Sequence, residues 1–288
     1  MNIYSPSQTA TYSRCPVKRQ LASVERWVPR VLGKREIAAC LGRGVAAGLG
    51  TYYTLVQATG ACPDPATSSQ IASTIATQSL RELRDLGCQV PEYEASSAAT
   101  LGTRAADVIL NYAKWDRQDK VLSHDWQILH VEHSFPEHGN ARLDLGVDDG
   151  QGPAVLDWKT RGYLKGDMLP REVAKYENAG QLLHYSWAYA QFFGREYLPR
   201  YYVGLIVLQP RFFVEILPYT ITEEDHRQWL RSAQVKWEQM AVIDNDPSRP
   251  IAMADEHTDN YGDCEFRRAC FTHHWDPASM TAEYVRRP

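Results

Sequence analysis

Three carboxylates and one lysine stand in short strand-like runs at positions where apolar residues would be expected: Glu132, Asp144, Asp157 and Lys159. Strand residues two apart share a face, so Asp157 and Lys159 point the same way. Leaving such charges unpaired on a half-buried sheet would cost several kcal/mol in desolvation. A divalent cation such as Mg²⁺ would offset that cost, because hard cations prefer carboxylate and carbonyl oxygens.

These residue types predict metal-assisted attack of water on a phosphodiester. Asp144 and Asp157 would hold the metal, and the backbone carbonyl of Trp158 would supply a further oxygen. Lys159 would orient the attacking water, help to lower its pKa, or stabilise the negative charge that develops on the phosphorane.

The stretch that carries these residues predicts three antiparallel strands in a meander. Apolar and β-branched runs at 128–135, 141–147 and 154–160 are separated by segments rich in Pro, Gly, Asn and Asp. Such a pattern of short runs and turn residues is typical of successive hairpins.

Asp144, followed thirteen residues later by Asp157-Trp-Lys159, resembles the motif of the PD-(D/E)xK nuclease superfamily, specifically its RecB-like branch (the CRISPR-adaptation and AddB type). That branch shows a Gly-x-x-Asp strand, an Asp-x-Lys-Thr strand and a Gln-x-x-x-Tyr helix. Here the second element matches at 157–160 and the third at 181–185, whereas Asn140-Ala141 stands where the glycine of the first often lies. The Ser-Pro-Ser start of the chain and the Cys15-Pro16 pair also resemble this branch.

The resemblance implies an α/β restriction-endonuclease-like core, with a central mixed β-sheet flanked by helices and an added N-terminal helical lobe. We expect one nuclease domain over 1–288, with the helical lobe at about 20–115, the catalytic core at about 120–220, and a C-terminal helix and cysteine tail at 221–288. The implied enzyme is a DNA nuclease of exonuclease type that uses Mg²⁺ or Mn²⁺.

The resemblance also assigns roles to individual residues. Glu132 would be a metal ligand or would position the water; the alternative is an edge-strand glutamate in water. Gln181 would contact the site or the backbone near the lysine, and Tyr185 would pack there or contact DNA; the alternative is an ordinary interior helix. The expected catalytic residues are Asp144, Asp157, Lys159, Glu132, Gln181 and Tyr185, and the expected metal ligands are Glu132, Asp144, Asp157 and Trp158. Many relatives add a histidine after a helix glycine near the position of Gly48, but no histidine precedes residue 124 here.

The apolar periodicity and the capping residues predict the remaining elements. Helices are expected at 34–55, 67–87, 96–114 and 170–193, with a further helix that Ser5 and Pro6 begin. Strands are expected at 202–208 and 212–217. The sequence from Thr222 to Asp225 resembles a capping box and predicts a helix that runs to about 240.

Three cysteines match a further feature of the RecB-like branch, a [4Fe–4S] cluster held by thiolates from both ends of the chain. They are Cys15, Cys264 and Cys270, but the fourth cysteine is missing near Tyr261 and His257, and such clusters normally take four thiolates. A Cys₃His zinc site completed by one of the histidines at 257, 273 and 274 is an alternative. Three thiols packed without a metal is another.

Composition limits the classes of protein to consider. The apolar fraction of 44% and the mixed charges predict a globular protein, and no apolar run is long enough to span a bilayer. The N-terminus lacks the pattern of a secretory signal, so a cytoplasmic location is expected. With a net charge of −4, any positive potential that attracts DNA must be local. The cations that follow the catalytic strand are the candidates: Arg161, Lys165, Arg171 and Lys175.

The expected partners are DNA and a recombination or helicase protein, in recombination, repair, or a phage or mobile-element pathway. Three other interpretations remain: a non-catalytic nucleic-acid-binding module with the same fold, an iron–sulfur-dependent structural subunit, and an unrelated enzyme with a chance motif. The last predicts that Asp144, Asp157 and Lys159 do not converge in space.

Overall fold

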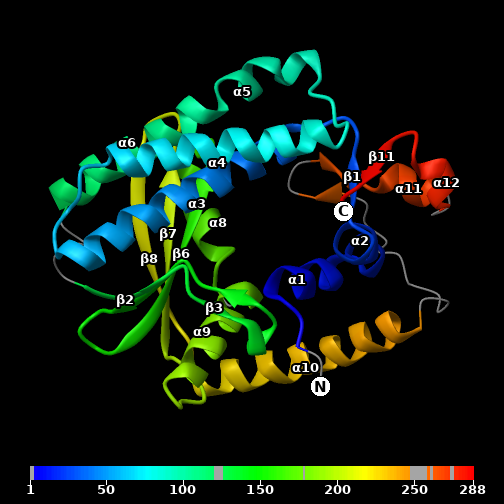
Figure 1. The fold of residues 1–288 in the computed structure, drawn as a ribbon. Coiled ribbons are helices and arrows are strands. Elements are labelled where there is room, and N and C mark those ends of the chain that lie inside the picture. The colour runs from blue at the N-terminus through cyan, green and yellow to red at the C-terminus, as the bar shows by residue number, and fades with distance from the viewer. Residues whose placement is uncertain (1–2, 120–125, 178, 247–257, 260–261, 273–275) are drawn as a thin grey trace.

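The computed structural model describes residues 3–119, 126–177, 179–246, 258–259, 262–272 and 276–288. Its centre is a five-stranded sheet in the order β2-β5-β6-β7-β8 (Figure 1). The strands are β2 (Gln127–Val131), β5 (Leu145–Asp148), β6 (Pro153–Arg161), β7 (Arg200–Val207) and β8 (Phe213–Thr220). The sheet is mixed, because β6 and β7 are parallel while the other neighbours are antiparallel.

The expected meander is present, with one difference. The strands β2, β5 and β6 pair in sequence order, as the turn residues indicate. The segment 134–142, however, forms a separate two-stranded hairpin of β3 (Ser134–Phe135) and β4 (Ala141–Arg142). The chain leaves the main sheet at Glu132, whose φ of +49° is uncommon for a residue with a side chain. The expectation of one continuous strand over 128–135 was therefore wrong.

One face of the sheet is covered by α3 (Lys34–Thr59), α4 (Ala66–Asp85) and α6 (Leu101–Asp119). The expected helix at 96–114 is divided between α5 (Ala95–Ala99) and α6. The helices α3, α4 and α6 pack closely: a Cβ at Gly44 would lie 2.5 Å from the Ala72 carbonyl oxygen of α4. Their buried side chains form one core with the residues of β6 that point toward them, Leu156 and Trp158.

The other face is covered by α8 (Leu169–Ala174) and α9 (Gly180–Phe192), which pack on Val155, Val203 and Leu205 of the sheet. The single helix expected at 170–193 was wrong, because the chain turns between α8 and α9. Two tyrosines of the sheet account for the break: the Tyr219 hydroxyl donates to the Val173 carbonyl (2.7 Å) and the Tyr201 hydroxyl donates to the Tyr176 carbonyl (2.6 Å). These bonds satisfy carbonyls that a continuous helix would otherwise use.

The two ends of the chain lie together beside this core (Figure 1). The N-terminal part forms α1 (Pro6–Arg14), α2 (Pro16–Arg19), a π-helical turn (Gln20–Val24) and β1 (Trp27–Pro29). The C-terminal part forms α10 (Glu223–Asn245), β9 (Thr258–Asp259), β10 (Gly262–Asp263), α11 (Arg267–Phe271), α12 (Pro277–Met280) and β11 (Tyr284–Arg286). Short 3₁₀ turns occur at Glu92–Glu94, Pro136–His138 and Gly166–Met168. Pairing of β1 with β11 joins the two ends.

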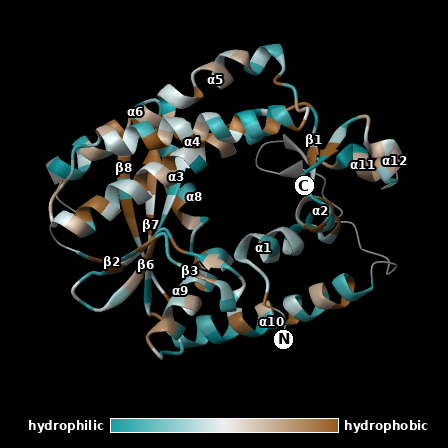
Figure 2. Cartoon of the chain, in the orientation of Figure 1, coloured by the Kyte–Doolittle hydropathy of each residue, from teal (hydrophilic) through white to brown (hydrophobic). Residues whose placement is uncertain are grey.

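Both N-terminal helices are fixed by contacts with distant segments. Arg19 is 2% exposed and makes a bidentate ion pair with Asp244 of α10. The Trp237 indole of α10 donates to the Thr9 hydroxyl (3.0 Å). In Figure 2 the strands β7 and β8 show hydrophobic stretches, whereas α10 alternates along its length between hydrophilic and hydrophobic residues. No helix of the described residues is long and apolar enough to cross a membrane.

Candidate active site

Strand β6 carries the two motif residues that share a face. Asp157 is 3% exposed, and its carboxylate oxygen Oδ2 lies 2.7 Å from the Lys159 ammonium. Trp158 points to the opposite face, where it stacks on Tyr53 with ring centroids 6.1 Å apart. Its ring lies against Gly204 of β7, where an added Cβ would be 2.0 Å from the ring. The strand is thus fixed on one face by aromatic packing and carries its charges on the other.

Asp144, just before β5, is held against β6 by a backbone hydrogen bond. The Trp158 amide donates to Asp144 Oδ2 at 2.7 Å, so the two motif aspartates are set side by side by the pairing of their strands. The Glu132 amide donates in turn to the Asp144 carbonyl (2.9 Å). The structure therefore brings together Asp144, Asp157 and Lys159, and it places the Glu132 backbone beside that of Asp144.

Burial and the neighbouring charges shift the pKa values of Asp144 and Lys159. Burial raises the pKa of Asp144, and the neighbouring Asp157 carboxylate raises it further. Burial alone would lower the pKa of Lys159, but the Asp157 and Asp144 carboxylates outweigh this effect and raise it. Lys159 is therefore an ammonium at neutral pH, and Asp144 is a carboxyl group that a further positive charge would ionise.

Helix α9 contributes Gln181 and Tyr185 to the same site. The Lys159 ammonium donates to Gln181 Oε1 (3.0 Å), and Gln181 Nε2 donates to the Tyr185 hydroxyl (2.9 Å). Burial raises the pKa of Tyr185, and the Asp157 and Asp144 carboxylates add to this effect. The i, i+4 pair thus orients the lysine from the helix side through two hydrogen bonds.

Glu132 closes the site on the side of α3. Its carboxylate lies 3.1 Å from Arg142 Nε, and the Glu132 side chain is 27% exposed. A Cβ at Gly50 would lie 2.9 Å from Glu132 Cγ, so the glycine makes room for the glutamate. Neither Gly50 nor Arg142 was predicted as a residue of the site. The glycines of α3 indicated a close approach to this helix. Gly48, which was compared with the family's glycine, packs on Ala72 and Ile109 and not on Glu132.

Two of the four cations expected to bind DNA pair instead with Glu172, a residue that the sequence did not point out. Glu172 is 4% exposed and accepts from Arg161 Nε and from Lys175 Nζ. The Tyr176 hydroxyl also donates to it, at 2.9 Å. Arg161 therefore fixes α8 to the end of β6, and Lys175 pairs with Glu172 within the α8 segment. Lys165, Arg171 and Lys175 are all exposed to solvent.

Two histidines near the first strand lie in an aromatic cluster. His130 Nδ1 is 2.9 Å from the Tyr189 hydroxyl, and the His130 ring packs on His133 and Phe192. Burial lowers the pKa of His130, and His133 adds to this effect.

The donor set fits a Mg²⁺ or Mn²⁺ ion. Among the residues that the structure describes, no three His, Cys, Asp or Glu side chains converge as a metal site. The adjacent carboxylates of Asp144 and Asp157 are nevertheless sufficient, because Mg²⁺ commonly binds one or two carboxylates of a protein and keeps several waters or substrate oxygens. Their mutual effect on the pKa of Asp144 is the repulsion that a cation between them would relieve.

The three cysteines of the proposed cluster lie in one region. Cys15 and Cys264 pack at the edge of a small core that contains Cys270, with Phe266 and Tyr284. Cys15 and Cys264 carry free thiols, and Cys270 is buried. Cys15 also caps α2, because its sulfur accepts from the Lys18 amide (3.4 Å). The positions considered for a fourth ligand, residues 257, 261, 273 and 274, lie outside the described residues.

Comparison with known proteins agrees with this geometry. Residues 3–271 match the family model described as the PD-(D/E)XK nuclease superfamily. No curated protein matches the chain. The match covers the sheet, the helices on both of its faces and α10.

Proposed function

The chain belongs to the PD-(D/E)XK nuclease superfamily, and we propose that it is a Mg²⁺- or Mn²⁺-dependent deoxyribonuclease of the RecB-like, exonuclease type. The observation that carries this proposal is the buried group at β6. Asp144, just before β5, accepts from the β6 backbone beside Asp157, and Lys159 lies 2.7 Å from Asp157. Such a group is costly to maintain without a function, because an adjacent pair of carboxylates destabilises the fold unless something positive binds between them.

The proposed reaction is the hydrolysis of a phosphodiester bond: water adds to phosphorus, and the sugar oxygen leaves with a proton. A divalent cation held by Asp144, Asp157 and the Trp158 carbonyl would polarise the phosphate and lower the pKa of the attacking water. The Lys159 ammonium would donate a hydrogen bond to the water or to the developing phosphorane oxygens. Because the pKa of Lys159 is raised, this residue acts as a fixed positive charge and not as a general base.

The residues around the lysine would keep it in place. Gln181 accepts one of the three hydrogens of the Lys159 ammonium. This bond fixes the direction in which the ammonium can donate to the substrate. Glu132 would orient the attacking water. For that role the Glu132 carboxylate must release Arg142 and bind the water in its place. The Arg142 side chain is 62% exposed. An ion pair with so exposed a partner is weak, so the exchange costs little.

We place this activity in the cytoplasm, in recombination, repair, or phage or mobile-element DNA processing, where a helicase or recombination protein would deliver the strand end. The exposed Lys165 and Arg171, which follow the catalytic strand, would contact the phosphates nearest the site. Lys165 lies on the segment between β6 and α8, and Arg171 lies on α8 itself.

The test is the degradation of end-labelled linear DNA and closed circular DNA with Mg²⁺, Mn²⁺ or EDTA. Lys159→Met keeps the side-chain stem and removes the charge, and the exposed lysine of α6, Lys114→Ala, is the control. We expect metal-dependent loss of the linear substrate only, reduced by at least about 10²-fold in Lys159→Met and unchanged in Lys114→Ala. Cutting of the circle would make the protein an endonuclease. DNA binding without cleavage in the presence of either metal would refute the catalytic proposal and indicate a non-catalytic binding module.

A further inference from the structure

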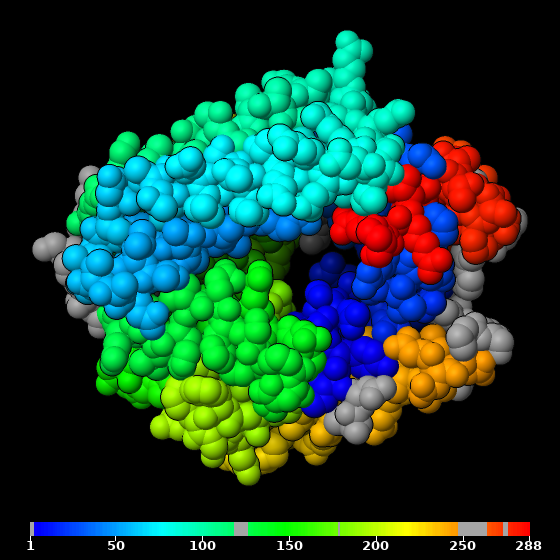
Figure 3. All heavy atoms as spheres, in the orientation of Figure 1, coloured from blue at the N-terminus to red at the C-terminus, as the bar shows by residue number. Residues whose placement is uncertain are grey.

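Arg142, on the hairpin of β3 and β4, is held beside the active site with its side chain at the surface. Its neighbours Ala141 and Leu143 are buried, and they pack in one core with Phe135 of the paired strand. Because successive strand residues point to opposite sides, the burial of these two neighbours directs Arg142 to solvent. In Figure 3 the green segments, to which the hairpin belongs, form the surface on one side of the hollow at the centre of the molecule. The hairpin thus presents Arg142 to a ligand that approaches from outside.

The guanidinium of Arg142 has a single partner among the described residues. Its Nε lies 3.1 Å from Glu132 Oε2, and neither Nη group makes a hydrogen bond within the described part of the chain. By contrast, the guanidinium of Arg161 is bound by Glu172 and Tyr176. A guanidinium carries five N–H donors in a fork that can bind a phosphate through two parallel hydrogen bonds. Arg142 therefore keeps most of its donors for another anion.

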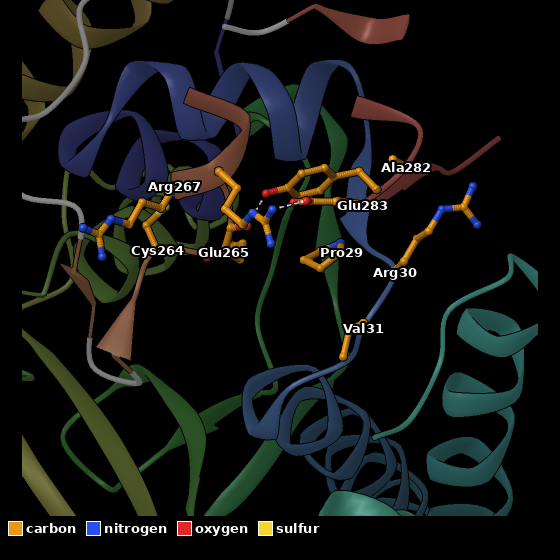
Figure 4. Close-up of a pocket in the computed structure, with 10 residues that line it drawn as sticks. Pro29, Arg30, Val31, Cys264, Glu265, Arg267, Ala282 and Glu283 are labelled. Carbon is orange, nitrogen blue, oxygen red and sulfur yellow. Dashed lines mark hydrogen bonds and ion pairs between the residues drawn. The ribbon is translucent and has the colours of Figure 1, made fainter. Parts of the chain in front are cut away.

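The arginines where the two ends of the chain meet are used differently. They line a pocket of about 410 Å³, but Arg268 pairs with Glu283 at 2.5 Å and Arg30 donates to the Thr281 carbonyl at 2.9 Å. Figure 4 shows the guanidinium groups of Arg30 and Arg267 directed away from this pocket. Arg30 and Arg268 thus hold the junction of the two ends together, in contrast to the exposed arginine of the hairpin.

A phosphodiester would bring a further negative charge to a site that is already rich in carboxylates. Once ionised, the three acids of the site carry three negative charges against the single positive charge of Lys159; they are Glu132, Asp144 and Asp157. A divalent cation and a phosphodiester together add one positive charge, so one negative charge remains, and the Arg142 guanidinium balances it. Burial raises the pKa of Glu132, and Arg142 opposes this effect. The arginine is therefore close enough to act on the charges of the site.

We propose that Arg142 is a substrate-binding residue that exchanges partners: it pairs with Glu132 in the free protein and binds a backbone phosphate beside the scissile bond when a DNA strand enters the site. The inference rests on the proposed nuclease function, which supplies the identity of the anion. The exchange releases the Glu132 carboxylate, which the proposed reaction needs for the attacking water. The ion pair that it breaks is weak, because the Arg142 side chain is largely exposed. Binding of the strand and release of Glu132 are thus one event.

The test measures the binding of a fluorescein-labelled single-stranded 30-mer by anisotropy at a series of salt concentrations. EDTA is present, so that no metal-dependent cleavage occurs. Arg142→Gln removes the charge, and Arg142→Lys keeps the charge without the fork. Arg231→Gln is the matched control, because this arginine of α10 also lies 3.1 Å from a glutamate and its side chain is 69% exposed. Melting temperatures equal to that of the wild type will show that the variants are folded.

We expect Arg142→Gln to lose one phosphate contact. The slope of log K against log[salt] should then become less steep by about 0.7, which corresponds to about 5-fold weaker binding at 0.1 M salt. Arg142→Lys should keep the wild-type slope, because the slope depends on the charge. Arg231→Gln should leave both the slope and the affinity unchanged.

The same substitution in Glu132→Gln protein separates a direct contact from an effect through Glu132. In this background the phosphate no longer competes with the Glu132 carboxylate for the guanidinium. Arg142→Gln should therefore weaken binding by more than the factor of about 5 expected in the wild-type background. An arginine that served only to hold Glu132 would have no effect on binding once that carboxylate is gone.

Three outcomes would overturn the inference. The first is an unchanged salt slope in Arg142→Gln, and the second is an equal loss of affinity in Arg231→Gln. The third is a loss in Arg142→Gln that vanishes, or stays the same size, in the Glu132→Gln background, since either result contradicts the exchange of partners. The proposed function fails separately: binding that depends on Arg142, by a protein that cleaves nothing with Mg²⁺ or Mn²⁺, would support the phosphate contact and refute the nuclease.

Discussion

His184 on α9 is expected to make the stability of the protein depend on pH between 7.5 and 4.5. Its side chain is 1% exposed, and Nε2 lies 3.0 Å from the His138 carbonyl oxygen, so Nε2 carries the proton of the neutral ring. The ring is enclosed by Trp187, Trp229 and Trp237, with centroid distances of 5.5 to 5.8 Å. Burial lowers the pKa of His184 from 6.5 to about 4, and it outweighs the hydrogen bond to the His138 carbonyl, which raises the pKa.

The sign and size of the effect follow from this pKa. A histidine whose pKa is lower in the folded state binds fewer protons there than in the unfolded chain, so its contribution is present above pH 6.5 and is lost as the pH falls toward 4. With these two pKa values, the free energy of unfolding should fall, relative to pH 7.5, by about 1.3 kcal/mol at pH 5.5 and by about 2.5 kcal/mol at pH 4.5.

The assay is urea denaturation of the wild type and of His184→Gln at a series of pH values. Glutamine is neutral throughout and can still donate to the His138 carbonyl. Other groups titrate alike in both proteins, so the difference between the two free energies isolates His184. We expect wild type to be more stable at pH 7.5 and to lose that advantage as the pH falls. A difference that stays constant from pH 7.5 to pH 4.5 would refute the reasoning.

Two further substitutions test the site. Gly204→Ala would place a Cβ 2.0 Å from the Trp158 ring, so chemical denaturation should show a loss of about 2 to 3 kcal/mol; Gly162→Ala, where a Cβ meets nothing within 4 Å, should be neutral, and equal stability of the two variants would contradict the packing argument. Asp144→Asn keeps an acceptor for the Trp158 amide but removes the repulsion with Asp157, so the metal-free variant should melt at or above the wild-type temperature. It should also lose the rise in melting temperature that Mg²⁺ gives the wild type, and a variant that keeps this rise would argue against Asp144 as a ligand.

Much of the fold could be predicted because it is encoded over a few residues at a time. The alternation of β6 placed Asp157 and Lys159 on one face, and the helical spacing placed Gln181 and Tyr185 one turn apart. The capping box at Thr222 is present, with Asp225 bonded to the Thr222 amide and hydroxyl. The helix runs on to Asn245, beyond the expected end. The assignment of the whole chain to a single domain stays a prediction.

The features that were missed depend on partners far away in the sequence. The helix expected at 170–193 has acceptable residues throughout, and it is divided by hydroxyls from Tyr201 and Tyr219, which no local pattern reveals. Likewise, nothing in the neighbourhood of Arg161 indicates that Glu172 will bind it in a buried position.

The sequence by itself determined which residues could do chemistry and how they face along each element, because side-chain direction repeats with the short period of a strand or helix. Only the tertiary structure decided which charges meet. Strand pairing set Asp144 against the Trp158 amide, Gly50 of α3 made room for Glu132, and a buried ion pair joined Arg19 to Asp244, 225 residues further along the chain. The energy of a charge depends on its distance from other charges and from water, and those distances exist only once the elements are packed.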